Sequence, residues 1–233
     1  MMDFSIPTLY YTLNKDYIID EAFKTLNDYN MFDVSFCSDA IYTYKYRTAI
    51  AWLSQVTSEI MEKAEDDLFV VCNSELSFAN NIKAEDICRR IVEAGNKGAQ
   101  ILLGNIDTAR DLYKIDNNLY WTDVFFHTSF LVVYKSAFEQ IANLLKQEEV
   151  GSMCLEQILI SLLDYKFISY PFLTLNRDFQ LSTNSNQTWY DNITSHFYEG
   201  IECQIKIYDG KREQFPYDGT KGYSLNQSHE QLY

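Results

Sequence analysis

The most constraining feature of the sequence is the apolar run Leu-Phe-Val-Val-Cys at residues 68–72, which is followed at once by the polar triplet Asn73-Ser74-Glu75. A short run with β-branched and aromatic residues predicts a strand that is buried on both faces. Open α/β sheets bind ligands at the carboxyl ends of their strands, so Glu75 is a candidate for a ligand site. The alternative is that Asn73 and Ser74 only form a turn and that Glu75 is solvated.

Strand and helix patterns alternate on both sides of this run. Apolar residues at helical spacing predict helices, and short apolar runs between polar breaks predict strands. The predicted strands are residues 8–13, 33–37, 68–72, 99–103, 124–134 and 167–175, and the predicted helices are residues 16–28, 47–64, 82–95, 136–145 and 151–163. We interpret residues 107–120 as a loop over a site, and Pro171 places the last strand at a sheet edge. The alternation predicts an α/β fold with a mainly parallel central sheet flanked by helices.

The charge balance argues against one class of partner. The chain has 19 Lys and Arg residues against 33 Asp and Glu residues, which gives a net charge of −14. A chain without a basic stripe cannot neutralise many phosphates, so we expect no binding of nucleic acid. An anionic small molecule is compatible with the chain only where a local cation or metal offsets the global field.

The cysteines and the first residues indicate the compartment. Five cysteines are scattered without a C-x-x-C pair, which is typical of free thiols in a reducing compartment. The opening Met-Met-Asp-Phe-Ser-Ile-Pro lacks the basic and apolar regions of a signal peptide, and no apolar run approaches about 18 residues. We therefore expect a cytoplasmic protein without a membrane span, for which peripheral association with a membrane stays open.

The order of these motifs resembles glycosyltransferase family 25, the lipooligosaccharide-biosynthesis and collagen-galactosyltransferase type. The resemblance covers residues 7–182 and depends on the order and spacing of short motifs. These are Tyr11-Thr12-Leu13-Asn14 near the end of the first strand, Leu53-Ser54-Gln55 in a helix, Asn73-Ser74-Glu75-Leu76-Ser77-Phe78 after the buried strand, residues 99–104, residues 130–145, Glu156 at a helix start, and residues 171–182.

The resemblance implies a GT-A-like nucleotide-sugar-binding domain at residues 1–182, followed by a C-terminal extension at residues 183–233 that it does not cover. It implies transfer of a galactose-like hexose from a nucleotide-diphosphate sugar to a glycan acceptor, in surface-polysaccharide or lipooligosaccharide assembly. In the family an acidic triplet binds a divalent cation that bridges the diphosphate, so Mn²⁺ or Mg²⁺ is implied, with Glu75 as its ligand. This chain departs from the family because Asn73 and Ser74 stand in place of two carboxylates, and Gln55 in place of a histidine.

The candidate site residues come from these motifs and from charged residues in predicted loops or at the ends of predicted elements. Glu156 is the expected general base for the acceptor hydroxyl, because one carboxylate suffices for that role; the alternative is an exposed first-turn glutamate favoured by the helix dipole. The expected donor-binding residues are Asn14, Arg47, Asn73, Ser74, Glu75, Asp107 and Arg177. Each charged member of this set has a plain alternative as a surface charge. His127 is expected to be a partly buried histidine within a strand.

Two other hypotheses follow from the altered triplet. The same fold could serve as a catalytically inactive GT-A-like binding or partner protein, because the carboxylates that hold the cation are reduced to one. Alternatively, the chain could be a metal-independent transferase in which Arg or Lys replaces the cation.

Overall fold

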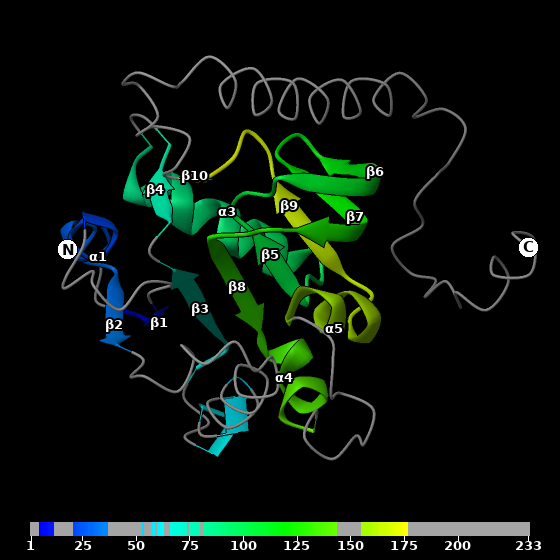
Figure 1. The fold of residues 1–233 in the computed structure, drawn as a ribbon, viewed down its shortest axis with the longest axis horizontal. Helices are drawn as coiled ribbons and strands as arrows, with labels where there is room; N and C mark the ends of the chain where they lie inside the picture. Colours follow the sequence, from blue (N-terminus) through cyan, green and yellow to red (C-terminus); the bar gives the residue numbers. More distant parts are fainter. Residues whose placement is uncertain are drawn as a thin grey trace, which may run out of the picture.

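The computed structural model describes residues 5–11, 21–36, 53, 57–58, 60–62, 66–73, 75–79, 82–143 and 155–176. Within these residues the protein is a mixed α/β structure (Figure 1). The elements follow the chain in the order β1 (Ile6–Tyr11), α1 (Glu21–Asp28), β2 (Phe32–Phe36), β3 (Leu68–Asn73), β4 (Leu76–Phe78), α3 (Ala84–Asn96), β5 (Ile101–Leu103), β6 (Thr108–Asp116), β7 (Leu119–Phe126), β8 (Phe130–Tyr134), α4 (Lys135–Ala142), α5 (Leu155–Leu162), β9 (Lys166–Ser169) and β10 (Thr174–Asn176).

Eight of these strands form one sheet in the order β2-β1-β3-β8-β5-β9-β7-β6, and β10 pairs with β4 in a small second sheet. The pairs β1–β2, β1–β3 and β5–β9 are parallel, whereas β3–β8, β5–β8, β7–β9 and β6–β7 are antiparallel. The prediction of a mainly parallel sheet is therefore wrong. After β5 the chain forms the hairpin of β6 and β7 instead of a crossover helix. It therefore re-enters the sheet as β8 from the edge where β3 and β5 end, and β8 runs antiparallel to both.

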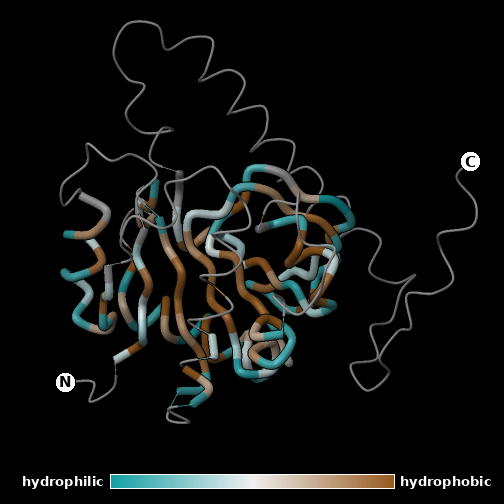
Figure 2. The backbone as a smooth tube through the Cα atoms, turned by 60° about the horizontal axis from the view of Figure 1, so that its bottom comes forward, coloured by the Kyte–Doolittle hydropathy of each residue, from teal (hydrophilic) through white to brown (hydrophobic). Residues whose placement is uncertain are grey.

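Alternate side chains of the central strands enter two apolar cores, as the pleat of a strand requires. Phe69 and Val71 of β3 belong to one core, and Val70 and Cys72 belong to the other. Helices α4 and α5 contribute to the first core, and α1 and α3 contribute to the second. Hydrophobic residues accordingly run along the central strands, while hydrophilic residues lie mainly in the flanking segments (Figure 2). The burial of β3 on both faces is confirmed.

The segment predicted to be a loop at residues 107–120 is instead most of a β-hairpin. Strands β6 and β7 pair in an antiparallel register that places Tyr113 opposite Trp121. The turn is made at Asn117 and Asn118, and the side chain of Asp116 accepts a hydrogen bond from the backbone N–H of Asn117 at 2.7 Å. Asparagine is common in turns because its side chain can bond the local backbone, so this signal was present in the sequence.

Two predicted strands also have different limits. The strand predicted at residues 124–134 is interrupted at residues 127–129, between β7 and β8. The last predicted strand, residues 167–175, is divided into β9 and β10: β9 lies between β5 and β7 and is not at an edge, whereas among the described strands β10 pairs only with β4. β9 ends at Ser169, before Pro171, so the proline removes no donor from its ladder.

Among the described residues, no helix has the length and apolar character that a membrane crossing requires.

Candidate functional site

The candidate site is built where β3 and β5 end, on either side of the start of β8. Cys72 of β3 pairs with Phe130, and Leu103 of β5 pairs with Leu131. The chain exits of both strands are held to β8 by further backbone bonds: Asn73 N–H donates to the Ser129 carbonyl at 3.2 Å, and Gly104 N–H donates to the Phe130 carbonyl at 2.8 Å. Three loops therefore meet at one edge of the sheet, which is where α/β sheets place ligands.

A buried asparagine ties two of these loops, the exit of β5 and the start of β8, to β10. Asn105 is fully buried, and its Oδ1 accepts hydrogen bonds from Ser129 N–H at 2.9 Å, from Ser129 Oγ at 2.9 Å and from Thr174 Oγ1 at 3.1 Å. One side chain thereby links the exit of β5 with the start of β8 and with β10. Buried polar groups that are fully satisfied in this way make a site rigid.

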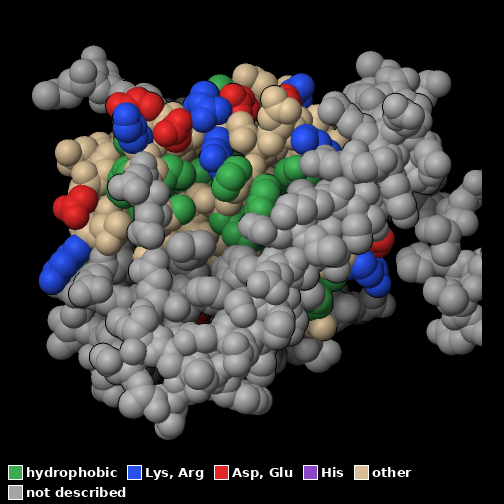
Figure 3. All heavy atoms as spheres, turned by 90° about the horizontal axis from the view of Figure 1, so that it is seen from above, with side chains coloured by type: hydrophobic (Ala, Val, Ile, Leu, Met, Phe, Trp, Pro, Cys, Tyr) green, Lys and Arg blue, Asp and Glu red, His purple; other side chains and the backbone are tan. Residues whose placement is uncertain are grey.

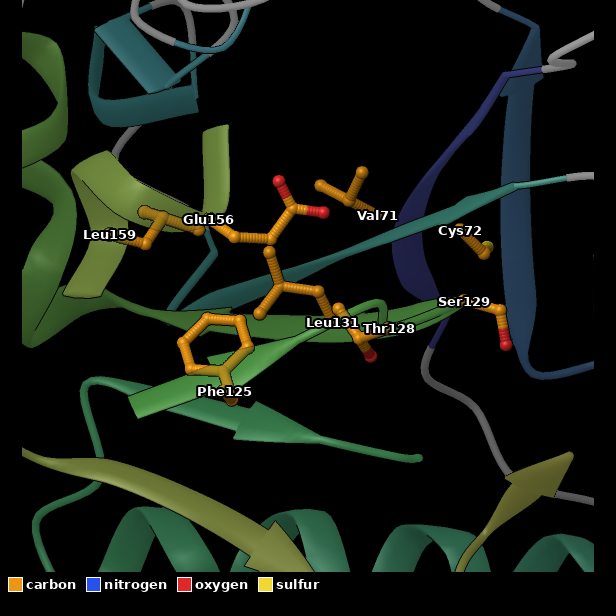
Figure 4. Close-up of a pocket in the computed structure, with 8 residues that line it drawn as sticks. All are labelled: Val71, Cys72, Phe125, Thr128, Ser129, Leu131, Glu156 and Leu159. Carbon is orange, nitrogen blue, oxygen red and sulfur yellow. The ribbon is translucent and has the colours of Figure 1, made fainter. Parts of the chain in front are cut away.

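Beside this junction lies a small cavity of about 20 Å³, which is room for about one water molecule. The carboxyl half of β3, the end of β7, the start of β8 and α5 supply its lining residues, which are Val71, Cys72, Phe125, Thr128, Ser129, Leu131, Glu156 and Leu159. In Figure 4 the carboxylate of Glu156 extends from α5 toward Val71, with Leu131 and Phe125 beneath it. Among the described residues of this lining, Glu156 is the only acidic one.

The position of Glu156 is set by its place in α5 and by the packing of that helix. It lies in the first turn of α5, where a carboxylate is favoured by the helix dipole. Ile158 and Leu159 of the same helix are buried in the core against the sheet, and this packing turns the first turn toward β3. The two interpretations of Glu156 are therefore compatible, because a dipole-favoured glutamate also lines the cavity.

The triplet after β3 has a structural role at its first position. Asn73 is buried, and its Oδ1 accepts a hydrogen bond from the backbone N–H of Glu75 at 2.9 Å. This is the side-chain-to-backbone turn that asparagine commonly forms. Glu75 is half-buried at the start of the connection to β4. The turn interpretation therefore holds for Asn73, while Glu75 remains at the strand exit.

The described residues do not make a preformed metal site. No group of three or more His, Cys, Asp or Glu side chains in this part of the chain is arranged to hold an ion. A divalent cation bound by Glu75 would need most of its ligands from phosphates and water. The described residues therefore supply too few ligands to bind a cation by themselves, and the Mn²⁺ or Mg²⁺ that the resemblance implies stays a prediction.

Asp107 and His127 form a pair at the same edge. The distance between His127 Nδ1 and Asp107 Oδ2 is 3.2 Å, and the His127 side chain is 72% exposed. His127 follows the end of β7 with a backbone φ of 55°, a left-handed conformation that few residues other than glycine adopt. The expectation of a partly buried histidine within a strand is wrong, because the left-handed residue ends β7 before the chain enters β8.

Arg110 and Arg90 have partners of different kinds, and within the described structure the buried Nε of Arg90 has no hydrogen-bond partner. Arg110 Nη2 lies 3.1 Å from Asp123 Oδ2, and its Nε lies 3.4 Å from Asp111 Oδ2. Arg90 of α3 donates from Nη1 to Ser169 Oγ at 2.8 Å and to the carbonyl of Pro171. Burial lowers the pKa of the Arg90 guanidinium from its usual value.

Charged side chains of both signs are intermixed on the face seen from above, where they surround an apolar area (Figure 3). No basic patch is visible on this face among the residues that are described.

Several predicted site residues lie outside the described residues, namely Asn14, Arg47, Ser74 and Arg177. The same holds for the C-terminal extension at residues 183–233. Sequence reasoning missed two residues that the fold brings to the edge, Asn105 and His127. Asn105 and Gly104 directly follow a buried strand, and a polar residue in this position is a pattern from which Asn105 could have been predicted as a site residue. Nothing in the local pattern signalled that His127 would be exposed.

Comparisons with known proteins complete the description. No protein-family model matches the chain, and no curated protein matches it. A glycosyltransferase involved in the glycosylation of the major capsid of PBCV-1 is similar in structure, with a TM-score of 0.44 and 12% sequence identity, over 70% of this chain and 81% of that chain. A197 from STIV is similar with a TM-score of 0.45 and 10% identity, over 74% of this chain and 91% of that chain. These likenesses do not assign the chain to a family, and membership of family 25 stays a prediction.

Proposed function

We propose that the chain is a hexosyltransferase that moves a galactose-like sugar from a nucleotide-diphosphate donor to a glycan acceptor, in surface-polysaccharide or lipooligosaccharide assembly. One observation carries the proposal: α5 brings the carboxylate of Glu156 into a cavity formed by the end of β3 and the start of β8. Glu75 lies two residues after Asn73, the last residue of β3, whose backbone N–H donates to the Ser129 carbonyl just before β8. A carboxylate in a small lined cavity beside strand ends is suited to general base catalysis.

The size of the cavity decides what enters it. About 20 Å³ accommodates one water molecule, whereas pockets for whole cofactors measure roughly 300–1,000 Å³. We therefore assign the cavity to the reacting hydroxyl of the acceptor, and the donor to the open edge beside Glu75 and Asp107. This division separates the proton acceptor from the leaving diphosphate.

The proposed step conserves atoms and charge. The Glu156 carboxylate takes the proton of the acceptor hydroxyl as that oxygen forms a bond to the anomeric carbon of the donor. The bond between the anomeric carbon and the diphosphate oxygen breaks, and the diphosphate leaves with the electron pair. Positioned proton transfer of this kind contributes about 10²- to 10⁴-fold in rate.

A second candidate function has its own supporting observation. Asparagine at position 73 supplies no carboxylate, and its Oδ1 accepts the hydrogen bond of the turn to Glu75. The chain therefore also suits a catalytically inactive protein that binds a sugar nucleotide or a glycan at the same edge. Such a protein would bind ligand without releasing nucleoside diphosphate.

The test compares two glutamates in equivalent helical positions. Glu156→Gln should lower the release of nucleoside diphosphate at least 100-fold, with donor and glycan acceptor panels and with Mn²⁺ present or absent. Glu85→Gln is the matched control, because Glu85 lies in the first turn of α3 and does not line the cavity. It should retain the wild-type rate.

Two results would decide against the transferase. Equal rates in Glu156→Gln and wild type would remove Glu156 from the reaction. Thermal stabilisation by a nucleotide sugar without any release of nucleoside diphosphate would favour the binding protein instead, because a ligand at about 100 times its dissociation constant adds about 2.7 kcal/mol to stability.

A further inference from the structure

A transferase needs a group that stabilises the negative charge of the leaving diphosphate. The described residues around Glu75 do not form a site for a divalent cation. Arg110 is already within ion-pair distance of Asp111 and Asp123, and Arg90 donates to Ser169 and Pro171. These contacts leave room for a further charge-stabilising side chain at the edge.

His127 meets the requirements of position and exposure. It lies two positions before Ser129, whose carbonyl accepts the hydrogen bond from Asn73 N–H at the exit of β3. Its side chain is largely exposed, in contrast to Thr128 and Ser129, which line the cavity. A ligand that lies across the strand ends can therefore reach the imidazole without entering the core.

A carboxylate lies beside the imidazole. His127 Nδ1 lies 3.2 Å from Asp107 Oδ2, which is within ion-pair distance, and Nε2 lies on the other side of the ring. The backbone of the two loops is also tied, because Asp107 N–H donates to the Phe126 carbonyl at 3.1 Å. In the imidazolium both nitrogens donate, so Nε2–H can donate to an anion while Nδ1–H stays on Asp107.

The backbone at His127 adds an independent observation. A φ of 55° is uncommon for a residue with a side chain, and such residues cluster at functional sites. Here the left-handed turn ends β7 and holds the side chain out from the edge instead of into the core. Neither β7 nor β8 requires a histidine at this position for its own packing.

From these observations we propose that His127, oriented by Asp107, donates a hydrogen bond from Nε2 to the diphosphate of the sugar-nucleotide donor. The inference rests on the proposed function for the identity of the donor. No covalent step involves the imidazole; it stabilises the charge that the diphosphate acquires when the bond to the anomeric carbon breaks.

The direct experiment is an NMR titration of the histidine ring signals. The chain has three histidines, so the ring spectrum is simple, and the loss of a signal in His127→Asn assigns His127. Asparagine is enriched in the left-handed conformation, so this variant removes the imidazole with the least strain on the backbone. Inorganic pyrophosphate and UDP should both shift the His127 signal, whereas uridine, which has no phosphate, should leave it in place.

Affinity gives a second measurement. Hydrogen bonds to charged groups contribute about 1.5–3 kcal/mol, so His127→Asn should weaken UDP binding by roughly 10-fold or more in titration calorimetry. Asp107→Asn should weaken it in the same direction by a smaller factor. Asp123→Asn is the control: it removes an ion pair of Arg110 on the same hairpin without touching His127, and it should bind UDP within about twofold of wild type.

The outcomes separate this inference from the proposed function. If the His127 signal responds to pyrophosphate but no donor is turned over, the diphosphate site stands and the transferase fails. If a donor is turned over while the wild-type His127 signal ignores pyrophosphate and UDP, or His127→Asn binds UDP like wild type, the transferase stands and this inference is wrong. The wild-type titration decides the question even where the variant folds poorly.

Discussion

Replacing Asn105 by alanine should destabilise the protein and loosen the candidate site together. The substitution removes the acceptor of Ser129 N–H, Ser129 Oγ and Thr174 Oγ1. The Ser129 N–H is fixed by the backbone at a buried position, so losing its acceptor costs about 1–3 kcal/mol. The two hydroxyls can rotate toward other acceptors, so each adds at most about 1 kcal/mol. We therefore expect Asn105→Ala to lower the free energy of unfolding by about 2–4 kcal/mol.

Urea unfolding measures this loss directly. For an m-value near 2 kcal/mol/M, the midpoint should fall by about 1–2 M with m unchanged. Asn143→Ala is the matched control, because the Asn143 side chain makes an exposed bond to the Glu139 carbonyl at 2.9 Å. Its midpoint should move by less than about 0.5 M.

A double-mutant cycle isolates the central contact. Ser129→Ala removes the hydroxyl that donates to Asn105 Oδ1, so the cycle of Asn105→Ala with Ser129→Ala should give a coupling energy of about 0.5–3 kcal/mol. Purely additive effects, or a midpoint for Asn105→Ala equal to that of Asn143→Ala, would refute the assignment of Asn105 as the residue that links the exit of β5, the start of β8 and β10.

Three other predictions follow from single contacts. Gly104→Ala should lower the free energy of unfolding by about 1–3 kcal/mol in the same urea assay, because its new Cβ would lie 2.8 Å from Phe130 Cδ1 and 3.0 Å from Thr174 Oγ1; an unchanged midpoint would contradict this close packing. Tyr134→Phe should cost about 1 kcal/mol at pH 8 through the lost bond to the Ile91 carbonyl. Burial raises the pKa of Tyr134 above its ordinary 10.0, so the tyrosine of the unfolded chain ionises first as the pH rises past 10. The free energy of unfolding of the wild type should therefore fall in this range, and that of Tyr134→Phe should fall less between pH 8 and 10.5. Asn73→Asp with Ser74→Asp keeps an acceptor for Glu75 N–H and adds carboxylates beside Glu75, so Mn²⁺ affinity in calorimetry should rise over wild type; no rise would place Glu75 away from any cation.

Much of the secondary structure could be predicted from local pattern alone. The run at residues 68–72 is a strand buried on both faces, and the periodic segments near residues 82–95 and 151–163 contain α3 and α5. The spacing of apolar residues within one segment indicates whether one or both of its faces are buried. This prediction does not require knowing which segments pack against it. The position of Asn73 and Glu75 at the exit of β3 follows from the same run.

Which strands become neighbours was decided by the tertiary structure. The order β3-β8-β5 and the reversal of β8 depend on where the hairpin of β6 and β7 returns the chain, and no local period records this. The cavity at Glu156 is lined by residues from β3, β7, β8 and α5. The hydrogen bonds of Asn105 link the exit of β5 to the start of β8 and to β10. His127 is exposed because a left-handed residue ends β7, whereas its aromatic neighbours in the sequence suggested burial. Contacts between residues far apart in sequence depend on packing and register, and these are properties of the folded chain as a whole.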